Sequence, residues 1–171
     1  MGERLRFHCW TNGPKIHCMP PRIPPPLVML IAAALMWTLH HGLPLGHLID
    51  FPWNYLGVLP AAIGRVITVA AGNRFRQART TFDAFRPGDA SSLVTDGVFR
   101  FSRNPMYLGS LLLLSGWAVG LGTVSPWLVL PFFAMFTSIV QIVPEERALE
   151  ARFGETYVAY RHRVRRWVGY N

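Results

Sequence analysis

Three charged side chains flank the longest uncharged stretch of the chain. Arg103 precedes this stretch, Glu145 and Glu146 follow it, and the 41 residues between them carry no formal charge. If the stretch folds as a helical hairpin, both of its ends lie on one face, and topology alone brings a guanidinium near two carboxylates. One interpretation is a polar ligand site at that face, and the other is a salt bridge that closes the ends of the hairpin.

Composition indicates where such a hairpin would lie. The chain has 171 residues, of which 51% are hydrophobic and 15% are charged, whereas an average soluble domain is about 25% charged. A helix needs about 20 mostly apolar residues to cross a bilayer. We therefore predict an all-α integral membrane bundle with about four transmembrane helices, at residues 27–43, 53–72, 105–121 and 126–143.

A soluble four-helix protein is the alternative to a membrane bundle. Its helices would each need a polar stripe facing water. Neither Leu111–Leu114 nor Trp127–Phe136 has such a stripe. High hydrophobicity also excludes intrinsic disorder, and two cysteines are too few for a disulfide scaffold.

The basic residues predict the orientation. The formal net charge is +8, and all but one of the 17 Lys and Arg lie before the first span, between the second and third, or after the fourth. Lys and Arg mark the cytoplasmic side of a membrane protein. We expect a multi-pass protein in contact with the lipid bilayer, with both termini cytoplasmic, and no binding of nucleic acid.

The remaining segments divide into an extension and one domain. Residues 1–22 form a polar extension that we expect to be disordered, and residues 23–171 form a single domain. The extension contains two His-Cys pairs, His8-Cys9 and His17-Cys18, whose spacing matches no zinc-binding pattern, so no metal site is predicted. Residues 73–80 are expected to continue the second helix. A helix from Pro144 is expected either to lie on the membrane surface or to fold back on the bundle, with one apolar stripe: Leu149, Phe153, Tyr157 and Tyr160.

Two further features lie inside the predicted spans. Arg65 interrupts the second span about 18 Å from its start, at the helical rise of about 1.5 Å per residue; it is either a functional charge or a side chain that reaches the interface. Gly116 and Gly120 form a small-xxx-small step that favours close helix packing.

Two motifs in the second half of the chain resemble a known family. Arg103-Asn104-Pro105-Met106-Tyr107-Leu108-Gly109 is similar to the Arg-His-Pro-x-Tyr-x-Gly signature of the isoprenylcysteine carboxyl methyltransferase and phospholipid methyltransferase superfamily. Pro144-Glu145-Glu146 and the segment Phe153–Trp167 resemble its closing region. The resemblance covers about Thr80 to Trp167, and Asn104 replaces the histidine of the signature.

The resemblance implies a methyltransferase that uses S-adenosylmethionine without a Rossmann domain. It implies that Arg103, Glu145 and Glu146 do the chemistry of the site: a glutamate would bind the ammonium or ribose hydroxyls of the cofactor, and Arg103 a carboxylate. The cofactor-binding residues that it implies are Arg103, Asn104, Pro105, Tyr107, Gly109, Glu145, Glu146, Tyr157 and Tyr160. Because Asn104 does not titrate, it has no acid–base role.

The acceptor of the methyl group stays open at this point. It is a lipophilic or small molecule that offers a carboxylate, an amine or a thiol at the cytoplasmic interface. Two alternatives also remain. The first is a membrane reductase that uses NADPH, since sterol reductases resemble the superfamily near the C-terminus. The second is a small membrane protein with no activity, in which Arg103 and the glutamates form structural ion pairs.

Overall fold

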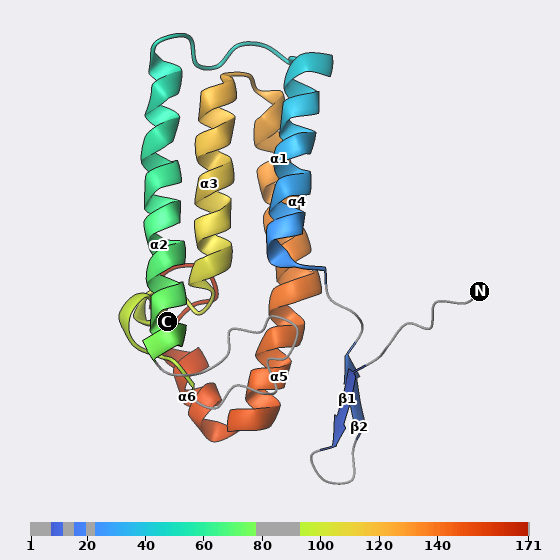
Figure 1. Ribbon diagram of the computed structural model, residues 1–171, viewed down its shortest axis with the longest axis vertical. Helices are drawn as coiled ribbons and strands as arrows, with labels where there is room; N and C mark the ends of the chain where they lie inside the picture. Colours follow the sequence, from blue (N-terminus) through green and yellow to red (C-terminus); the bar gives the residue numbers. More distant parts are fainter. Residues whose placement is uncertain (1–7, 12–15, 20–22, 78–92, 171) are drawn as a thin grey trace, which may run out of the picture.

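The computed structural model describes residues 8–11, 16–19, 23–77 and 93–170, and most of them are helical. Four long helical segments run side by side, and the last continues past the others at the end where the C-terminus lies (Figure 1). Of the N-terminal extension, for which we predicted disorder, two short strands are described, β1 (His8–Thr11) and β2 (Ile16–Met19). They pair antiparallel, with Cys9 opposite Cys18. The bundle is therefore the predicted helical one, with a small hairpin added.

The first three helices agree closely with the predicted spans. Helix α1 covers Pro25–Gly42, and α3 covers Pro105–Leu121. Both begin with proline in the first turn, where a missing N–H costs nothing. The second segment combines a 3-10 turn, η1 (Trp53–Gly57), with helix α2 (Val58–Gln77). As predicted, α2 continues beyond residue 72; residues 78–80 lie outside the described residues.

The fourth apolar segment differs from the prediction at its end. It begins with η4 (Ser125–Leu128) and continues through α4 (Val129–Thr137), the π-helical turn η5 (Ser138–Ile142) and α5 (Val143–Phe153). These turns form one helix from Ser125 to Phe153. The expected end at Val143 and new start at Pro144 are therefore wrong. The π-helical turn ends at Ile142, two residues before Pro144, whose ring and missing N–H disrupt regular α-helical bonding.

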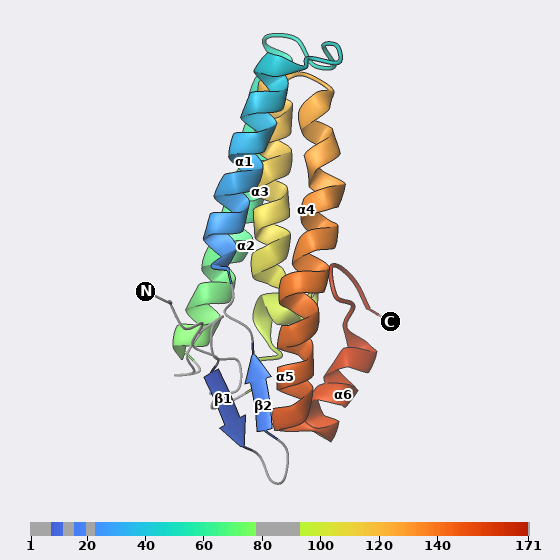
Figure 2. The ribbon, with the colours of Figure 1, turned by 90° about the vertical axis from the view of Figure 1, so that its right-hand side faces the viewer.

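The expected single helix after Pro144 is also broken. Gly154 has φ of 53° and ψ of −127°, so the chain turns between α5 and α6 (Glu155–Arg163). Figure 2 shows α6 folded back beside α5. The residues of the predicted stripe still meet, because Leu149 and Phe153 of α5 pack against Tyr157, Tyr160 and Val164. The stripe was thus identified correctly, but a turn rather than one continuous helix brings its members together.

Small residues place α2 directly against α3. A Cβ added to Gly64 would meet the backbone of Gly109, and one added to Gly116 would meet the backbone of Gly57. The two contacts repeat at the same spacing along both helices, as in the close packing of membrane helices. Gly116 therefore has the packing role that the sequence predicted. Gly120 has no atom near its own Cβ position, but its backbone faces Gly57.

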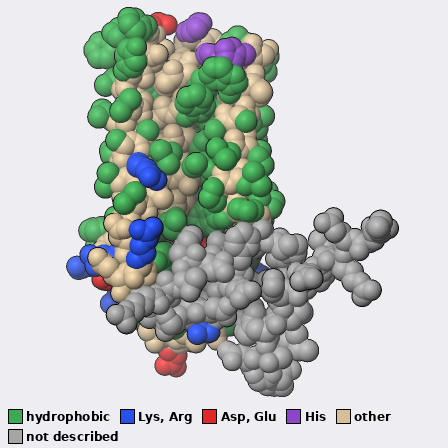
Figure 3. Space-filling model, in the orientation of Figure 1, with side chains coloured by type: hydrophobic (Ala, Val, Ile, Leu, Met, Phe, Trp, Pro, Cys, Tyr) green, Lys and Arg blue, Asp and Glu red, His purple; other side chains and the backbone are tan. Residues whose placement is uncertain are grey.

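The outside of the bundle is apolar. Two helical segments, Trp53–Gln77 and Ser125–Phe153, are long and apolar enough to cross a membrane, and Pro105–Leu121 is a shorter apolar helix. Only 17% and 33% of the most hydropathic windows of the first two are buried, whereas a core helix of a soluble protein is mostly buried. Hydrophobic side chains cover most of the upper surface in Figure 3, with Lys and Arg gathered toward the lower end. This is the surface of a membrane protein.

Arg65 belongs to this outer surface. Its side chain is exposed on α2, between the exposed residues Ile63 and Val66. The apolar core lies elsewhere, between α1, α3 and α4, around Met36 and Ala118. Arg65 therefore faces the surroundings of the bundle, as expected of a side chain that extends toward an interface.

The two turns at the far end of the bundle are joined by backbone hydrogen bonds. Leu48 and Ile49 donate to the Gly122 carbonyl, and Val124 donates to the Gly46 carbonyl. Gly122 has φ of 73°, which favours glycine at the end of α3. The His40 ring also bonds the hydroxyl of Thr123 at 2.9 Å. These links hold the α1–α2 and α3–α4 turns together at this end of the bundle.

Candidate functional site

An ion cluster around Glu146 lies where α3 begins and the helix of the fourth segment continues into α5. Arg103 Nη1 is 3.0 Å from Glu146 Oε1, and the two side chains are only 10% and 9% exposed. Arg166, in the C-terminal segment, donates from Nη2 to Glu146 Oε2 at 2.7 Å and from Nε to Oε1 at 3.3 Å. The prediction that topology brings Arg103 near the acidic pair is confirmed. The cluster combines two guanidinium groups and one buried carboxylate.

The hydrogen-bonding capacity of Arg103 is not exhausted by this ion pair. Its Nε is buried and has no hydrogen-bond partner among the residues that the structure describes. A buried donor without a partner is costly, and native structures rarely keep one that has no role. The guanidinium can therefore donate a hydrogen bond from Nε to a further anionic or carbonyl group.

Two tyrosines of α6 close one side of the cluster. Tyr157 is 1% exposed and Tyr160 is 4% exposed, and their rings lie 6.2 Å apart. Burial, helped by the charge of Glu146, raises the pKa of Tyr157 to about 12. Burial also raises the pKa of Tyr160, whose hydroxyl donates to the carbonyl of Phe99 at 2.6 Å. Both phenols are thus neutral at physiological pH and act as walls and hydrogen-bonding groups rather than as bases.

The second glutamate has a different environment. The Tyr107 hydroxyl, on the first turn of α3, donates to Glu145 Oε1 at 2.8 Å. Tyr107 is 5% exposed, and Glu145 is half-buried. One turn earlier, the buried Gln141 donates from Nε2 to the Ile23 carbonyl at 3.0 Å. Successive turns of this helix therefore contact the starts of α1 and α3, and Glu145 lies beside the Glu146 cluster.

Asn104 connects the start of α3 to the C-terminal segment. Its Nδ2 donates to the Arg166 carbonyl at 3.3 Å, and its backbone N–H donates to Ser102 Oγ at 3.1 Å. The Arg103 N–H donates to the Arg165 carbonyl at 3.1 Å. Pro105 is fully buried at the helix start. Asn104 and Pro105 thus hold Arg103 in place, and the Asn104 amide is engaged with protein atoms.

Gly109 lies away from the charged cluster. A Cβ there would meet Thr68 Oγ1 and the Gly64 carbonyl of α2. Its position in the signature is therefore explained by helix packing. Four of the nine predicted site residues gather around the cluster: Arg103, Glu146, Tyr157 and Tyr160. Tyr107 and Glu145 form the neighbouring pair, and Asn104 and Pro105 support the start of α3. Gly109, the ninth, faces α2.

Two features of the site were missed by sequence reasoning. Arg166 pairs with Glu146, although it stands in a run of tail arginines that looks like a membrane-surface charge. Its place directly before Trp167, the last residue of the segment that resembles the family's closing region, gave no separate signal. The π-helical turn was also missed, although a proline within an uninterrupted apolar pattern is one local sign of such a turn.

Comparisons with known proteins identify the family of this chain. A family model described as "Phospholipid methyltransferase" matches residues 53–156, more than half of the chain. A protein of Haemophilus influenzae, described as uncharacterized, is 41% identical over 63 residues, which are 37% of this chain and 100% of the relative. No solved structure matches the chain significantly. The matched region includes α2, α3 and the helix that carries Glu145 and Glu146, so the chain belongs to the phospholipid methyltransferase family, within the superfamily of the isoprenylcysteine carboxyl methyltransferases.

Proposed function

We propose that this protein transfers a methyl group from S-adenosylmethionine to a lipophilic or small acceptor at the cytoplasmic face of the membrane. The acceptor atom would belong to a carboxylate, an amine or a thiol, as in the isoprenylcysteine carboxyl methyltransferases and their relatives. Family membership supports methyl transfer in general. The observation that carries the proposal is the nearly buried Arg103–Glu146 pair at the end of the apolar bundle, with Tyr157 against it.

The residues of the cluster fit this cofactor at its polar ends. S-adenosylmethionine, when bound, supplies a methyl group on a sulfonium, together with an ammonium and a carboxylate for recognition. The unpartnered Nε of Arg103 suits the carboxylate, because charge-assisted hydrogen bonds to guanidinium are strong. Glu145 suits the ammonium, because it is a half-buried carboxylate held by the Tyr107 hydroxyl, next in sequence to the Glu146 cluster.

Glu146 then has a positioning role rather than a direct one. Both of its oxygens are engaged by Arg103 and Arg166. A carboxylate held in this way orients the Arg103 guanidinium and offsets its charge in a buried place. Asn104 and Pro105 hold the start of α3, and Tyr157 and Tyr160 exclude water from one side. Since methyl transfer is an in-line displacement, such positioning is the main contribution that the chain can make.

The proposed topology places this site at the bilayer edge. Four membrane-spanning segments, formed by α1, η1–α2, α3 and η4–α4–η5, would cross the bilayer, with both termini cytoplasmic. The domain would comprise residues 23–171. Support comes from the exposed apolar surfaces of these segments and from the arginines at the end of the bundle where the site lies. The ligands would enter from the cytosol or from the bilayer.

Calorimetric titration of the detergent-purified full chain with S-adenosylmethionine, and separately with NADPH, tests the proposal. We expect S-adenosylmethionine to bind and NADPH not to bind. Arg103→Ala removes a charged hydrogen-bonding group, worth about 1.5–3 kcal/mol, so binding should weaken about tenfold or more. Labelled methyl transfer to membrane extracts then identifies the acceptor.

The controls separate loss of ligand binding from loss of folding. Arg147→Ala removes an exposed arginine of α5 at the same end of the bundle and should leave binding unchanged. Circular dichroism and size-exclusion profiles check that each variant is folded. Binding of NADPH, or binding of neither ligand to a folded parent chain, contradicts the proposal.

A further inference from the structure

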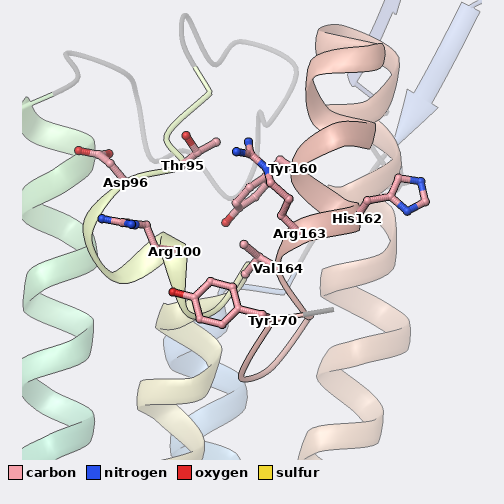
Figure 4. A pocket seen from close by; sticks show the side chains of 8 residues that line it. All are labelled: Thr95, Asp96, Arg100, Tyr160, His162, Arg163, Val164 and Tyr170. Atoms are coloured by element: carbon pink, nitrogen blue, oxygen red, sulfur yellow. The ribbon is translucent and has the colours of Figure 1, made fainter.

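A cavity lies at the same end of the molecule as the Arg103–Glu146 pair, and Tyr160 of the α6 helix is one of the residues that line it. Its volume is about 560 Å³, within the range of about 300–1,000 Å³ usual for ligand sites. Figure 4 shows the side chains that line the cavity. They come from η3 (Gly97–Arg100) and the two residues before it, from α6, and from the C-terminal segment that follows α6, residues 164–170. The lining residues are Thr95, Asp96, Arg100, Tyr160, His162, Arg163, Val164 and Tyr170. The methyl-transfer proposal does not use this cavity.

The charge of the lining favours an anion. Arg100 and Arg163 both line the cavity, and neither has an ion-pair partner among the residues that the structure describes. Asp96 is the acidic residue of the lining, and its carboxylate is paired with Arg74 of α2 at 3.0 Å. A phosphate or carboxylate would therefore be attracted here, while a bare ammonium would be repelled.

The rim of the cavity favours an amphiphile over a soluble ion. Tyr170 lines the cavity and is 56% exposed; Phe101, whose ring contacts it, and Val168, two residues before it in sequence, are 58% and 59% exposed. The rings of Phe101 and Tyr170 lie 6.1 Å apart, edge to face. Backbone hydrogen bonds fix this rim, because Gly169 donates to the Phe101 carbonyl and Arg165 donates to the Gly169 carbonyl. Apolar and aromatic side chains beside arginines are typical of a protein surface at the level of lipid head groups.

The position along the bundle agrees with this interpretation. Arg100 and Phe101 directly precede Ser102, Arg103 and Asn104, after which α3 enters the apolar part of the bundle. On the proposed topology, on which this step rests, the cavity opens at the cytoplasmic edge of the bilayer. The head group of a lipid in the bilayer could thus enter the cavity while its acyl chains stay in the membrane.

We propose that the cavity binds the anionic head group of a membrane phospholipid, through Arg100 and Arg163, with the acyl chains against Phe101, Val168 and Tyr170. The lipid is a ligand of the C-terminal segment in its own right, and its binding needs neither the cofactor nor the acceptor. By holding Tyr170 and Arg163, it steadies α6, which also carries Tyr157 and Tyr160 of the neighbouring site.

The test measures binding of short-chain phosphatidylglycerol to the detergent-purified full chain in the absence of cofactor. Short-chain phosphatidylcholine and inorganic phosphate are the two comparison ligands. Each basic residue near an anionic lipid contributes about 1 kcal/mol, so Arg100→Gln with Arg163→Gln should weaken phosphatidylglycerol binding about 30-fold. The matched control is Arg76→Gln with Arg147→Gln, which removes two exposed arginines outside the cavity.

The proposal is supported if phosphatidylglycerol binds more tightly than phosphatidylcholine and only the cavity double variant loses this binding. It is overturned if both double variants lose binding equally, which indicates general surface attraction. It is also overturned if inorganic phosphate binds as tightly as the lipid, which indicates a site for a free anion. Titration of the same samples with S-adenosylmethionine distinguishes this proposal from the methyltransferase proposal, since each ligand can bind or fail to bind independently.

Discussion

The Tyr107 hydroxyl donates a hydrogen bond of 2.8 Å to Glu145, a residue 38 positions later in the chain. This contact joins the first turn of α3 to the helix that leaves the apolar bundle after η5. The ion pair between Arg103 and Glu146 makes a parallel connection between the same two elements. The two glutamates are adjacent in sequence, yet one contacts an uncharged hydroxyl and the other contacts two guanidinium groups. Different roles follow for them.

Tyr107→Phe tests the role of Glu145. The variant keeps the ring in its buried place and removes the hydrogen bond, so the free energy of unfolding should fall by only about 1 kcal/mol. On the proposed function, Glu145 loses its orientation and S-adenosylmethionine should bind several-fold more weakly. Calorimetric titration gives the affinity, and thermal unfolding in detergent gives the stability.

Tyr55→Phe is the matched control for this change, because Tyr55 is 66% exposed. It should alter neither the affinity nor the stability. If Tyr107→Phe weakens stability while its affinity for the cofactor equals that of the parent, the Tyr107–Glu145 contact is structural and Glu145 does not bind the ammonium.

Glu146→Ala tests the buried ion cluster. The change leaves Arg103, whose side chain is only 10% exposed, without its carboxylate. Breaking a buried ion pair on one side costs about 3–5 kcal/mol, since an uncompensated charge stays buried. Removal of Arg166 should cost less, because its side chain is 37% exposed and Arg103 still neutralises Glu146. The free energy of unfolding in detergent, measured by denaturant titration, checks the order.

The exposed pair of Glu150 and Arg161 offers the comparison. Its side chains are 40% and 43% exposed, at a distance of 2.9 Å. Exposed pairs contribute about 0–1 kcal/mol, so Glu150→Ala should be nearly neutral. Equal losses for Glu146→Ala and Glu150→Ala contradict the argument that burial makes the cluster important.

Much of this arrangement could be predicted from the sequence. The bounds of α3 and the convergence of Arg103 on the acidic pair follow from uncharged lengths and from the topology of a hairpin. The break at Gly154 was missed, because the apolar stripe continues across it with helical spacing. Gly154 adopts a positive φ, and the spacing of apolar residues on either side of a glycine does not reveal its backbone conformation. The pairing of Arg166 was missed because one arginine in a basic tail looks like any other until the tail folds back.

Glycine substitutions test the contact between α2 and α3. Gly64→Ala and Gly116→Ala place a methyl group against the backbone of the facing helix, so either should destabilise the bundle by about 1–3 kcal/mol. Gly72→Ala is the control, because no atom lies within 4 Å of its Cβ position. Alanine is the better helix former, so this change should stabilise α2 by about 0.5–1 kcal/mol. Thermal unfolding of the three variants in one detergent gives the comparison, and equal effects at Gly64 and Gly72 contradict the close packing.

Alkaline titration tests the burial of Tyr157. Its pKa rises from 10.0 to about 12 because burial and the charge of Glu146 disfavour the phenolate. Between these two pH values the unfolded chain releases the Tyr157 proton while the folded chain keeps it. Stability gained below pH 10 is therefore lost as the pH rises toward 12, by up to about 1.4 kcal/mol per pH unit.

Tyr157→Phe should remove this contribution to the alkaline loss of stability. When tyrosinate absorbance is followed in the ultraviolet as the pH is raised, the variant should lose absorbance that develops near pH 12, the late phase. The absorbance that develops near pH 10, the early phase, should stay as in the parent. If Tyr157→Phe reduces the early phase, the phenol is in contact with water in solution, and α6 does not cover the Arg103–Glu146 pair as the structure describes.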